Sequence, residues 1–188
     1  ARNLLEPELP ADVARLLVQT GLPAGLLKLE VTESALMAEP ERSLPALHSL
    51  VDLGLAMSVD DFGTGHSSLA RLRDLPVDEV KIDRSFIRDV ATSRDDLAIV
   101  RAVIGLGHDL GLHVVAEGVE DDATWRLLRE LDCDLVQGYV LARPMPGADM
   151  TAWLKERFAG FTTPLTGQRS PSASAQAQDP SAETSLGS

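Results

Sequence analysis

The sequence contains one cysteine, Cys133, and has no long apolar run. A single cysteine cannot form a disulfide within the chain, and the Cys spacings of a zinc site are absent. No segment approaches the about 20 apolar residues that a membrane-spanning helix needs, and no secretory signal pattern is visible. Because the chain begins with Ala1 rather than Met, we expect it to be a fragment of a longer protein.

Positive charge is also scarce: there are 17 Lys and Arg residues against 29 Asp and Glu residues, and the formal net charge is −12. Proteins that bind the nucleic-acid backbone need clustered Lys and Arg residues. The composition therefore argues against a polymeric nucleic-acid partner. If the ligand is a phosphate ester, a bound divalent cation is the obvious group to offset the acidic field. The length of 188 residues, with 44% hydrophobic residues, is ordinary for one globular domain.

Segments with helical and strand periodicity alternate along the chain. We expect strands at Leu26–Thr32, Leu55–Val59, Val80–Ile82, His113–Ala116 and Asp134–Val136, and helices at Leu4–Gln19, Ser43–Leu53, Ser67–Leu72, from Ser93 to about Leu110, after Asp121 and at Ala148–Phe158. This order predicts an α/β fold with parallel strands and helical crossovers. Five strands do not close a barrel, so the chain is either a small open sheet or lacks about three strands of an eight-stranded barrel.

The composition divides the chain into a domain at residues 1–160 and a tail at residues 161–188. The tail is rich in Ser, Ala, Pro and Gln and has almost no large apolar side chains. Ordering such a segment costs conformational entropy with little burial in return, so we expect it to be disordered. In the last predicted helix, by contrast, Met150, Trp153 and Leu154 share one face, which predicts that this face packs inward.

Charged and polar side chains recur where the predicted strands end. The candidates are Glu30, Asp60, Asp61, Lys81, Asp83, Glu117 and Gln137. Because the carboxyl ends of parallel strands meet at one edge, where α/β folds place their chemistry, we expect these side chains to converge. Clustered carboxylates without a set of Cys or His residues select hard cations such as Mg²⁺, Mn²⁺ or Ca²⁺.

Each of these residues also has a plain structural interpretation. An Asp between a strand and a helix often caps the helix, and Lys81 could form a salt bridge with one of the acids. Isolated caps need not recur at successive strand ends, and the recurrence favours a site. Glu33 is either a metal ligand or a loop anchor that accepts backbone N–H groups, and we favour the anchor. The glycine-rich residues 61–65 lack the spacing of a dinucleotide-binding motif and predict a loop with unusual backbone angles.

Five motifs together resemble the EAL-type cyclic-di-GMP phosphodiesterases. They are LEVTES at Leu29–Ser34, DDFGTGHSSL at Asp60–Leu69, KIDRSFI at Lys81–Ile87, AEGVE at Ala116–Glu120 and QGYVLARP at Gln137–Pro144. The resemblance covers about residues 1–158 and implies the C-terminal five-strand portion of a modified (β/α)8 TIM-type barrel. The Glu-Ala-Leu strand and the next strand, with its metal-binding Asn, would then be absent from the chain.

The resemblance also implies a two-metal site. Its metal ligands would be Glu30, Asp60, Asp61 and Glu117, and its catalytic residues Lys81, Asp61 and Glu117. Asp83 and Gln137 would position the substrate or the attacking water, and Glu33 would stabilise the neighbouring loop. The implied cofactors are two Mg²⁺ or Mn²⁺ ions, with Ca²⁺ inhibitory, and the implied reaction is hydrolysis of cyclic-di-GMP to linear pGpG.

Several properties of the whole protein follow as expectations from the same resemblance. They are a homodimer formed near the Asp61–Ser67 loop, upstream sensory or GGDEF-type domains, and second-messenger signalling in a bacterial cytoplasm, with any membrane anchor outside this segment. His66 stands where the family usually has an aromatic residue, which puts the family's dimer coupling in doubt. We expect the isolated chain to be inactive because ligands from the missing strands are absent. The alternatives are a non-catalytic cyclic-di-GMP receptor or scaffold and an unrelated metal hydrolase on a small sheet.

Overall fold

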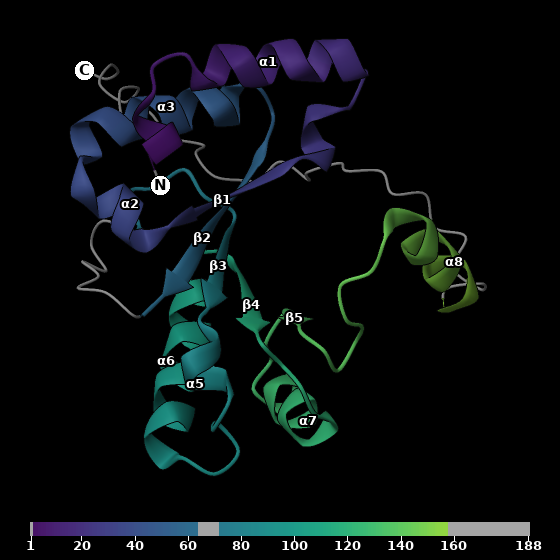
Figure 1. Ribbon diagram of the computed structural model, residues 1–188. Helices are drawn as coiled ribbons and strands as arrows, with labels where there is room; N and C mark the ends of the chain where they lie inside the picture. The colour runs from purple at the N-terminus through teal and green to yellow at the C-terminus, as the bar shows by residue number, and fades with distance from the viewer. Residues whose placement is uncertain (1, 64–71, 158–188) are drawn as a thin grey trace, which may run out of the picture.

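The computed structural model describes residues 2–63 and 72–157, and its strands form one parallel sheet (Figure 1). In spatial order the strands are β1 (Lys28–Thr32), β2 (Ala56–Phe62), β3 (Glu79–Ile82), β4 (His113–Glu117) and β5 (Leu135–Gln137). Each strand pairs in parallel with the strand that follows it in the chain. The predicted α/β fold with parallel strands and helical crossovers is therefore confirmed.

Helices precede the sheet, connect its strands and follow the last one. They are α1 (Leu9–Thr20), α2 (Glu33–Ala38), α3 (Pro40–Asp52), α5 (Arg84–Ile87), α6 (Arg94–Asp109), α7 (Asp122–Glu130) and α8 (Gly147–Arg157), with short 3-10 turns η1 (Arg2–Leu5) and η2 (Ala24–Leu26). Within residues 2–63 and 72–157, no helix has the length and apolar character needed to cross a membrane.

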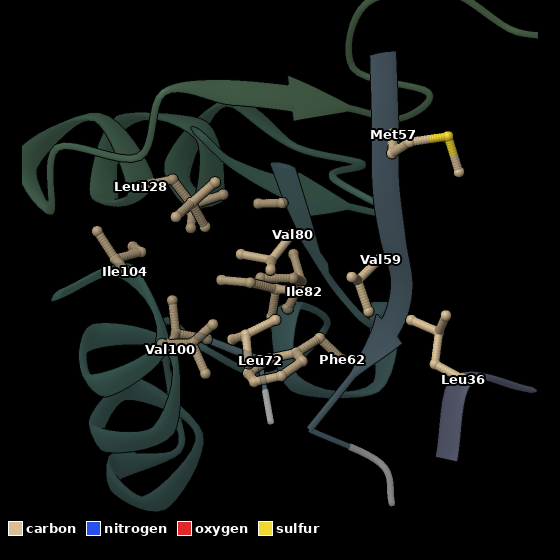
Figure 2. Packing of buried hydrophobic residues seen from close by; sticks show 14 of the residues in the cluster. Leu36, Met57, Val59, Phe62, Leu72, Val80, Ile82, Val100, Ile104 and Leu128 are labelled. Carbon is tan, nitrogen blue, oxygen red and sulfur yellow. The ribbon is translucent and has the colours of Figure 1, made fainter. Parts of the chain in front are cut away.

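One face of the sheet is apolar and is covered by helices. Val80 and Ile82 of β3 lie on this face, and Figure 2 shows them on the side of Val100 and Ile104 of α6. All four side chains are at most 3% exposed. Because burying one such side chain contributes about 1.5–3 kcal/mol, this packing fixes the position of β3 and of the residues on its other face.

The opposite face of the sheet is charged. Strand residues alternate between faces, so Lys28 and Glu30 share one side of β1, and Glu79 and Lys81 share one side of β3. Glu79 and Lys81 are buried despite their charges. The candidate site is built on this charged face.

Strand β2 runs further than its sequence predicts. It ends at Phe62 rather than at Val59, so Asp60 and Asp61 belong to the strand instead of following it. The pairing with β3 shifts register between Val59 and Phe62, and Asp61 adopts a left-handed backbone with a φ of 55°. A bulge of this kind turns a side chain away from the regular alternation, which a pattern of apolar residues does not reveal.

The first predicted helix is two elements in the structure. The turn η1 and helix α1 replace a continuous helix, and α1 has a proline in its first turn. Proline fits the first turn because the N–H group that it lacks would have no partner there. Helix α3 likewise begins at Pro40, three residues before the predicted start at Ser43.

The prediction for α8 was wrong. Met150 is 37% exposed and Leu154 is 44% exposed, and no described residue of this helix is buried. Met150 and Trp153 instead line one side of a cavity of about 440 Å³ whose other side is the charged face of the sheet. Figure 1 shows α8 set apart from the strands. The predicted helix at 67–72, apart from Leu72, and the predicted tail at 161–188 lie outside the described residues.

Candidate active site

Lys81 lies at the centre of the predicted site. Its ammonium Nζ is 2.9 Å from Glu30 Oε2 of β1 and 3.5 Å from Asp60 Oδ1 of β2, and it also contacts Glu117 Oε1 of β4. These three acids come from three different strands and meet because the strands are parallel and lie side by side around β3. The structure thus brings together four of the candidate residues, and the salt bridge considered for Lys81 is formed with three acids rather than one.

The charge of Lys81 is maintained by these contacts. Burial alone lowers the pKa of a lysine, and the Lys81 side chain is only 4% exposed. Hydrogen bonds from Lys81 to Glu117 and Glu30, together with the nearby charge of Asp60, outweigh this effect and raise its pKa above the usual value. Lys81 is therefore an ammonium group throughout the physiological pH range and serves as a hydrogen-bond donor rather than as a base.

The bulge at the end of β2 places two carboxylates side by side. Asp61 has a pKa above its usual value because of burial and because the negative charges of Asp60 and Asp83 lie close to it. Asp60 Oδ1 is buried and has no hydrogen-bond partner among the described residues. Its contact is the 3.5 Å ion pair with Lys81. A buried anionic oxygen without a hydrogen bond is costly, and a cation is the partner that would satisfy it.

Asp83 has a capping role as well as a place beside Asp61. Its Oδ1 accepts hydrogen bonds from the Ser85 N–H at 2.9 Å and from Ser85 Oγ at 2.5 Å, which caps the N-terminus of α5. Burial raises the pKa of Asp83, but the two bonds from Ser85 outweigh it and lower the pKa below its usual value. The helix-capping interpretation therefore applies to Asp83, which also lines a cavity of about 590 Å³.

Glu33 lies at the start of α2 and reaches the end of β2. Its side chain is buried, and Oε2 accepts a hydrogen bond from the Gly63 N–H at 3.2 Å. Gly63 has a φ of 95°, a conformation that favours glycine. This contact is of the kind expected of a loop anchor. Residues 64–71, including His66, lie outside the described part of the chain.

Gln137 ends β5 beside the cluster. It pairs in register with Glu117 and lines the cavity of about 440 Å³ together with Glu30 and Lys81. The next residue, Gly138, packs so closely that a Cβ atom there would lie 2.1 Å from the Val119 carbonyl oxygen. The glycine is therefore required for the segments after β4 and β5 to meet.

No ready-made metal cage is visible in residues 2–63 and 72–157, where no three Asp, Glu, His or Cys side chains are grouped to hold an ion. Glu30, Asp60 and Glu117 are grouped around the Lys81 ammonium instead. Their chemistry nevertheless fits a hard divalent cation, because the donors are carboxylate oxygens and Asp60 Oδ1 is buried without a hydrogen bond.

The comparison with known sequences decides the family. Residues 1–144 match the EAL domain. The chain belongs to the EAL domain family. This EAL chain is 48% identical over 155 residues to the cyclic di-GMP phosphodiesterase NbdA of Pseudomonas aeruginosa, an alignment that covers 82% of the chain and 20% of that protein. The chain thus spans about a fifth of the length of this curated relative, and the resemblance noted from its motifs is confirmed.

Solved structures agree with this assignment. The EAL chain superimposes on the PaMucR phosphodiesterase, solved as a c-di-GMP complex, with a TM-score of 0.76 and 44% identity over 79% of this chain and 60% of that one. It superimposes on Klebsiella pneumoniae BlrP1, solved with manganese and cyclic-di-GMP, with a TM-score of 0.70 and 33% identity over 74% of this chain and 36% of that one.

One charged contact on the same face was not among the candidates. Lys28 Nζ is 2.5 Å from Glu79 Oε2, and the Glu79 side chain is only 5% exposed. The sequence did carry a signal, because Lys28 and Glu79 each lie two residues before a candidate residue, Glu30 and Lys81, and strand alternation places them on the same face.

Proposed function

We propose that the domain containing this chain hydrolyses one phosphodiester bond of cyclic-di-GMP and releases linear pGpG, with Mg²⁺ or Mn²⁺ as cofactor. The observation that carries the proposal is the contact of Lys81 with three acids, each from a different strand. They are Glu30 of β1, Asp60 of β2 and Glu117 of β4. Its relatives in the EAL family support the choice of substrate, because NbdA is named as a cyclic di-GMP phosphodiesterase.

The residues of the cluster divide into two roles. Glu30, Asp60, Asp61 and Glu117 are the proposed cation ligands. The bound cations, two in this proposal, supply a Lewis acid and a water molecule of lowered pKa. Lys81, which keeps its proton, donates hydrogen bonds to a phosphate oxygen or to the attacking water, and its positive charge offsets the negative charge of the phosphate.

The surrounding residues hold this arrangement in place. Asp83 and Gln137 are proposed to position the substrate or the water. Asp83 lies at the N-cap of α5, directly after β3, and Gln137 pairs with Glu117. Glu33 is proposed to stabilise the loop after β2 through Gly63. A ligand set held by such contacts binds metal more tightly than a loosely held set.

The setting of the domain is also a proposal. We propose that it acts in the cytoplasm as a homodimer joined near the Asp61–Ser67 loop, next to sensory or GGDEF-type domains. The net charge of −12 supports a small nucleotide rather than a polymeric nucleic acid as the ligand. Among cations, Mg²⁺ and Mn²⁺ are proposed to activate and Ca²⁺ to inhibit.

The test uses the full-length protein with cyclic-di-GMP and Mn²⁺ or Mg²⁺. Chromatography of the nucleotides follows the appearance of pGpG over time, and equilibrium dialysis measures binding of the intact dinucleotide in Ca²⁺. Formation of pGpG that stops when the metal is chelated supports the proposal. Tight binding without product would show that the domain is a receptor, and neither binding nor product would exclude cyclic-di-GMP as its ligand.

A further inference from the structure

A second ion pair lies on the charged face next to the proposed site. Lys28 Nζ is 2.5 Å from Glu79 Oε2. Lys28 lies two residues before Glu30 on β1, and Glu79 lies two residues before Lys81 on β3. The Glu79 side chain is 5% exposed and the Lys28 side chain is 41% exposed, so the carboxylate is buried and the ammonium reaches it from the open side.

The two ion pairs have opposite polarity. In the first pair the cation is Lys28 on β1 and the anion is Glu79 on β3, whereas in the second the anion is Glu30 on β1 and the cation is Lys81 on β3. Residues two apart on a strand are about 6–7 Å apart. Each charge therefore has an opposite charge across the sheet and another along its own strand.

The space between the pairs is continuous. Lys28, Glu30, Glu79 and Lys81 all line the cavity of about 440 Å³. Ser58 of β2 pairs in register with both Glu30 and Glu79, and its small side chain leaves room for contacts across β2. A lysine that lost its partner in this cavity would have another carboxylate within the reach of its long side chain.

From this arrangement we infer that Glu79 is a positioning residue that holds the Lys28 ammonium away from Glu30. With Glu79 in place, Glu30 is free to bind Lys81 and a divalent cation. Without it, Lys28 turns to Glu30 and competes with the cation for that carboxylate. The inference rests on the proposed function, in which Glu30 is a metal ligand.

Stability alone does not account for this ion pair. Lys28 is 41% exposed, and an ion pair that is open to solvent on one side contributes little to stability. A lysine next to a proposed metal-binding carboxylate can also weaken metal binding. Its free ammonium group would compete with the metal ion for that carboxylate. Control of that competitor gives Glu79 a role that an apolar residue could not fill.

The test measures Mn²⁺ binding to the full-length protein by the electron paramagnetic resonance signal of free Mn²⁺. The substitution Glu79→Gln keeps the shape of the side chain and removes its charge. We expect it to raise the Mn²⁺ dissociation constant about tenfold, the size of effect seen when a partner of a metal ligand is lost. The double substitution Lys28→Gln with Glu79→Gln removes the competitor too and should restore the constant to within about twofold of the original.

Two further variants separate this role from a general loss of charge or fold. Glu39→Gln removes the same charge from an exposed ion pair with Arg42 and should leave Mn²⁺ binding unchanged. Lys28→Gln alone removes the competitor and should not weaken Mn²⁺ binding, a result that does not depend on whether the Glu79→Gln protein folds.

The outcomes distinguish this inference from the proposed function. If the unsubstituted protein binds Mn²⁺ but Glu79→Gln binds it equally well, the inference is overturned and the metal site stands. The same holds if the double variant is as weak as Glu79→Gln, or if Lys28→Gln weakens binding, because the pair would then only support the structure. If the unsubstituted protein binds no Mn²⁺, the proposed metal site and this inference both fail.

Discussion

Lys81 keeps its positive charge although its side chain is buried on one face of the sheet. Its ammonium is nearly buried, yet the contacts with Glu30 and Glu117 hold its pKa above the usual value. The same contacts hold acids from different strands close together despite their mutual repulsion. Lys81 is therefore both a proposed catalytic residue and a group that neutralises the charge of its acidic neighbours.

Lys81→Ala in the full-length protein should separate chemistry from metal binding. We expect pGpG formation to be abolished, because the donor to the phosphate or the water is gone. Mn²⁺ binding should be largely retained, because the carboxylates remain and lose a competing cation. Chromatography of the nucleotides measures the first effect, and calorimetric titration with Mn²⁺ measures the second.

Asp60→Asn is the matched comparison for Lys81→Ala. The substitution replaces the Asp60 carboxylate, whose Oδ1 is buried without a hydrogen bond, by a neutral amide. Both pGpG formation and the affinity for Mn²⁺ should therefore fall. Near-normal turnover of Asp60→Asn with Mg²⁺ or Mn²⁺ would contradict the assignment of Asp60 as a ligand. Normal turnover of Lys81→Ala would contradict the role given to Lys81.

The strands and their order were predictable because their signals are local. Apolar runs such as those ending at Val59 and Ile82 were bounded by glycine or charged residues, and alternation with helical segments favours parallel pairing. The recurrence of acids at successive strand ends predicted where the site would form. Helices α2 and α5 were missed because 6 and 4 residues are too few for a helical period to show.

Features that depend on contacts between distant segments could not be predicted in the same way. The bulge that turns Asp61 depends on the pairing of β2 with β3. The number of acids that contact Lys81 depends on which strands are neighbours. The exposure of α8 depends on what lies opposite its apolar side, and a hydrophobic pattern predicts a buried face without identifying its partner.

Asp134, the residue before β5, links β5 to β4 by hydrogen bonding. Its Oδ2 accepts hydrogen bonds from the Val114 N–H at 2.8 Å and interacts with His108 Nε2 at 3.0 Å. The same kind of contact occurs two strands earlier, where Asp78 Oδ2 accepts the Met57 N–H at 2.9 Å. Burial raises the pKa of Asp134, but the Val114 and His108 contacts outweigh it and lower the pKa below its usual value.

Asp134→Asn should therefore lower stability in a pH-dependent way. A carboxylate whose pKa is lower in the folded state stabilises that state above its unfolded pKa of about 3.9 and loses the effect as the pH falls through the folded pKa. At pH 7 we expect a loss of about 1 kcal/mol, or about 2–4 °C in the unfolding temperature. Scanning calorimetry of the full-length protein from pH 7 to pH 3 measures the difference.

The control for this effect is Asp52→Asn, which removes a charge from an exposed residue at the end of α3. It should unfold at the same temperature as the original protein at pH 7. A difference for Asp134→Asn that persists undiminished at pH 3 would show that shape rather than charge is responsible.

Gly138 directly follows Gln137 and packs against the backbone of Val119, two residues after Glu117. The Val119 N–H donates to the Gln137 carbonyl at 3.1 Å, and the Val140 N–H donates to the Val119 carbonyl at 3.0 Å. Gly138→Ala would place a Cβ within 2.4 Å of the Val119 nitrogen as well as against its carbonyl oxygen. We expect it to destabilise the domain by about 3 kcal/mol and to reduce turnover, both measurable on the purified full-length protein.

Gly105→Ala is the comparison for Gly138→Ala. An added Cβ at Gly105, inside α6, meets nothing within 4 Å, and alanine is the better helix former by about 1 kcal/mol. This variant should be at least as stable as the original. If Gly138→Ala behaves like Gly105→Ala, the close approach of the two segments does not position the site.

At the scale of the whole molecule, the described sheet has two open edges. In residues 2–63 and 72–157, β1 and β5 each pair with a strand on one side only. Leu135 of β5 is 50% exposed, and Leu154 of α8 is 44% exposed. Unpaired strand edges and exposed apolar side chains favour association with other chains. The charged face that carries the site is likewise open to the cavity next to α8.

These open edges lead to a prediction about the 188-residue chain itself. A two-metal site needs several oxygen ligands around each ion, held at fixed distances. The proposed ligands come from β1, β2 and β4, and the EAL resemblance implies a further Glu and Asn from upstream strands. We therefore expect the isolated chain to hydrolyse cyclic-di-GMP negligibly. A version extended upstream by about 90 residues, to the length of a complete eight-stranded barrel, should be active.

Both versions are assayed side by side at equal concentration with Mg²⁺ or Mn²⁺, and formation of the linear dinucleotide is followed by chromatography. Light scattering on the same samples shows whether the shorter chain aggregates, as its open edges lead us to expect. If the shorter chain stays monodisperse and still gives no product, missing ligands rather than aggregation explain the loss. Comparable rates from the two versions would show that the five described strands hold a complete catalytic site, and the proposed contribution of the upstream Glu and Asn would be wrong.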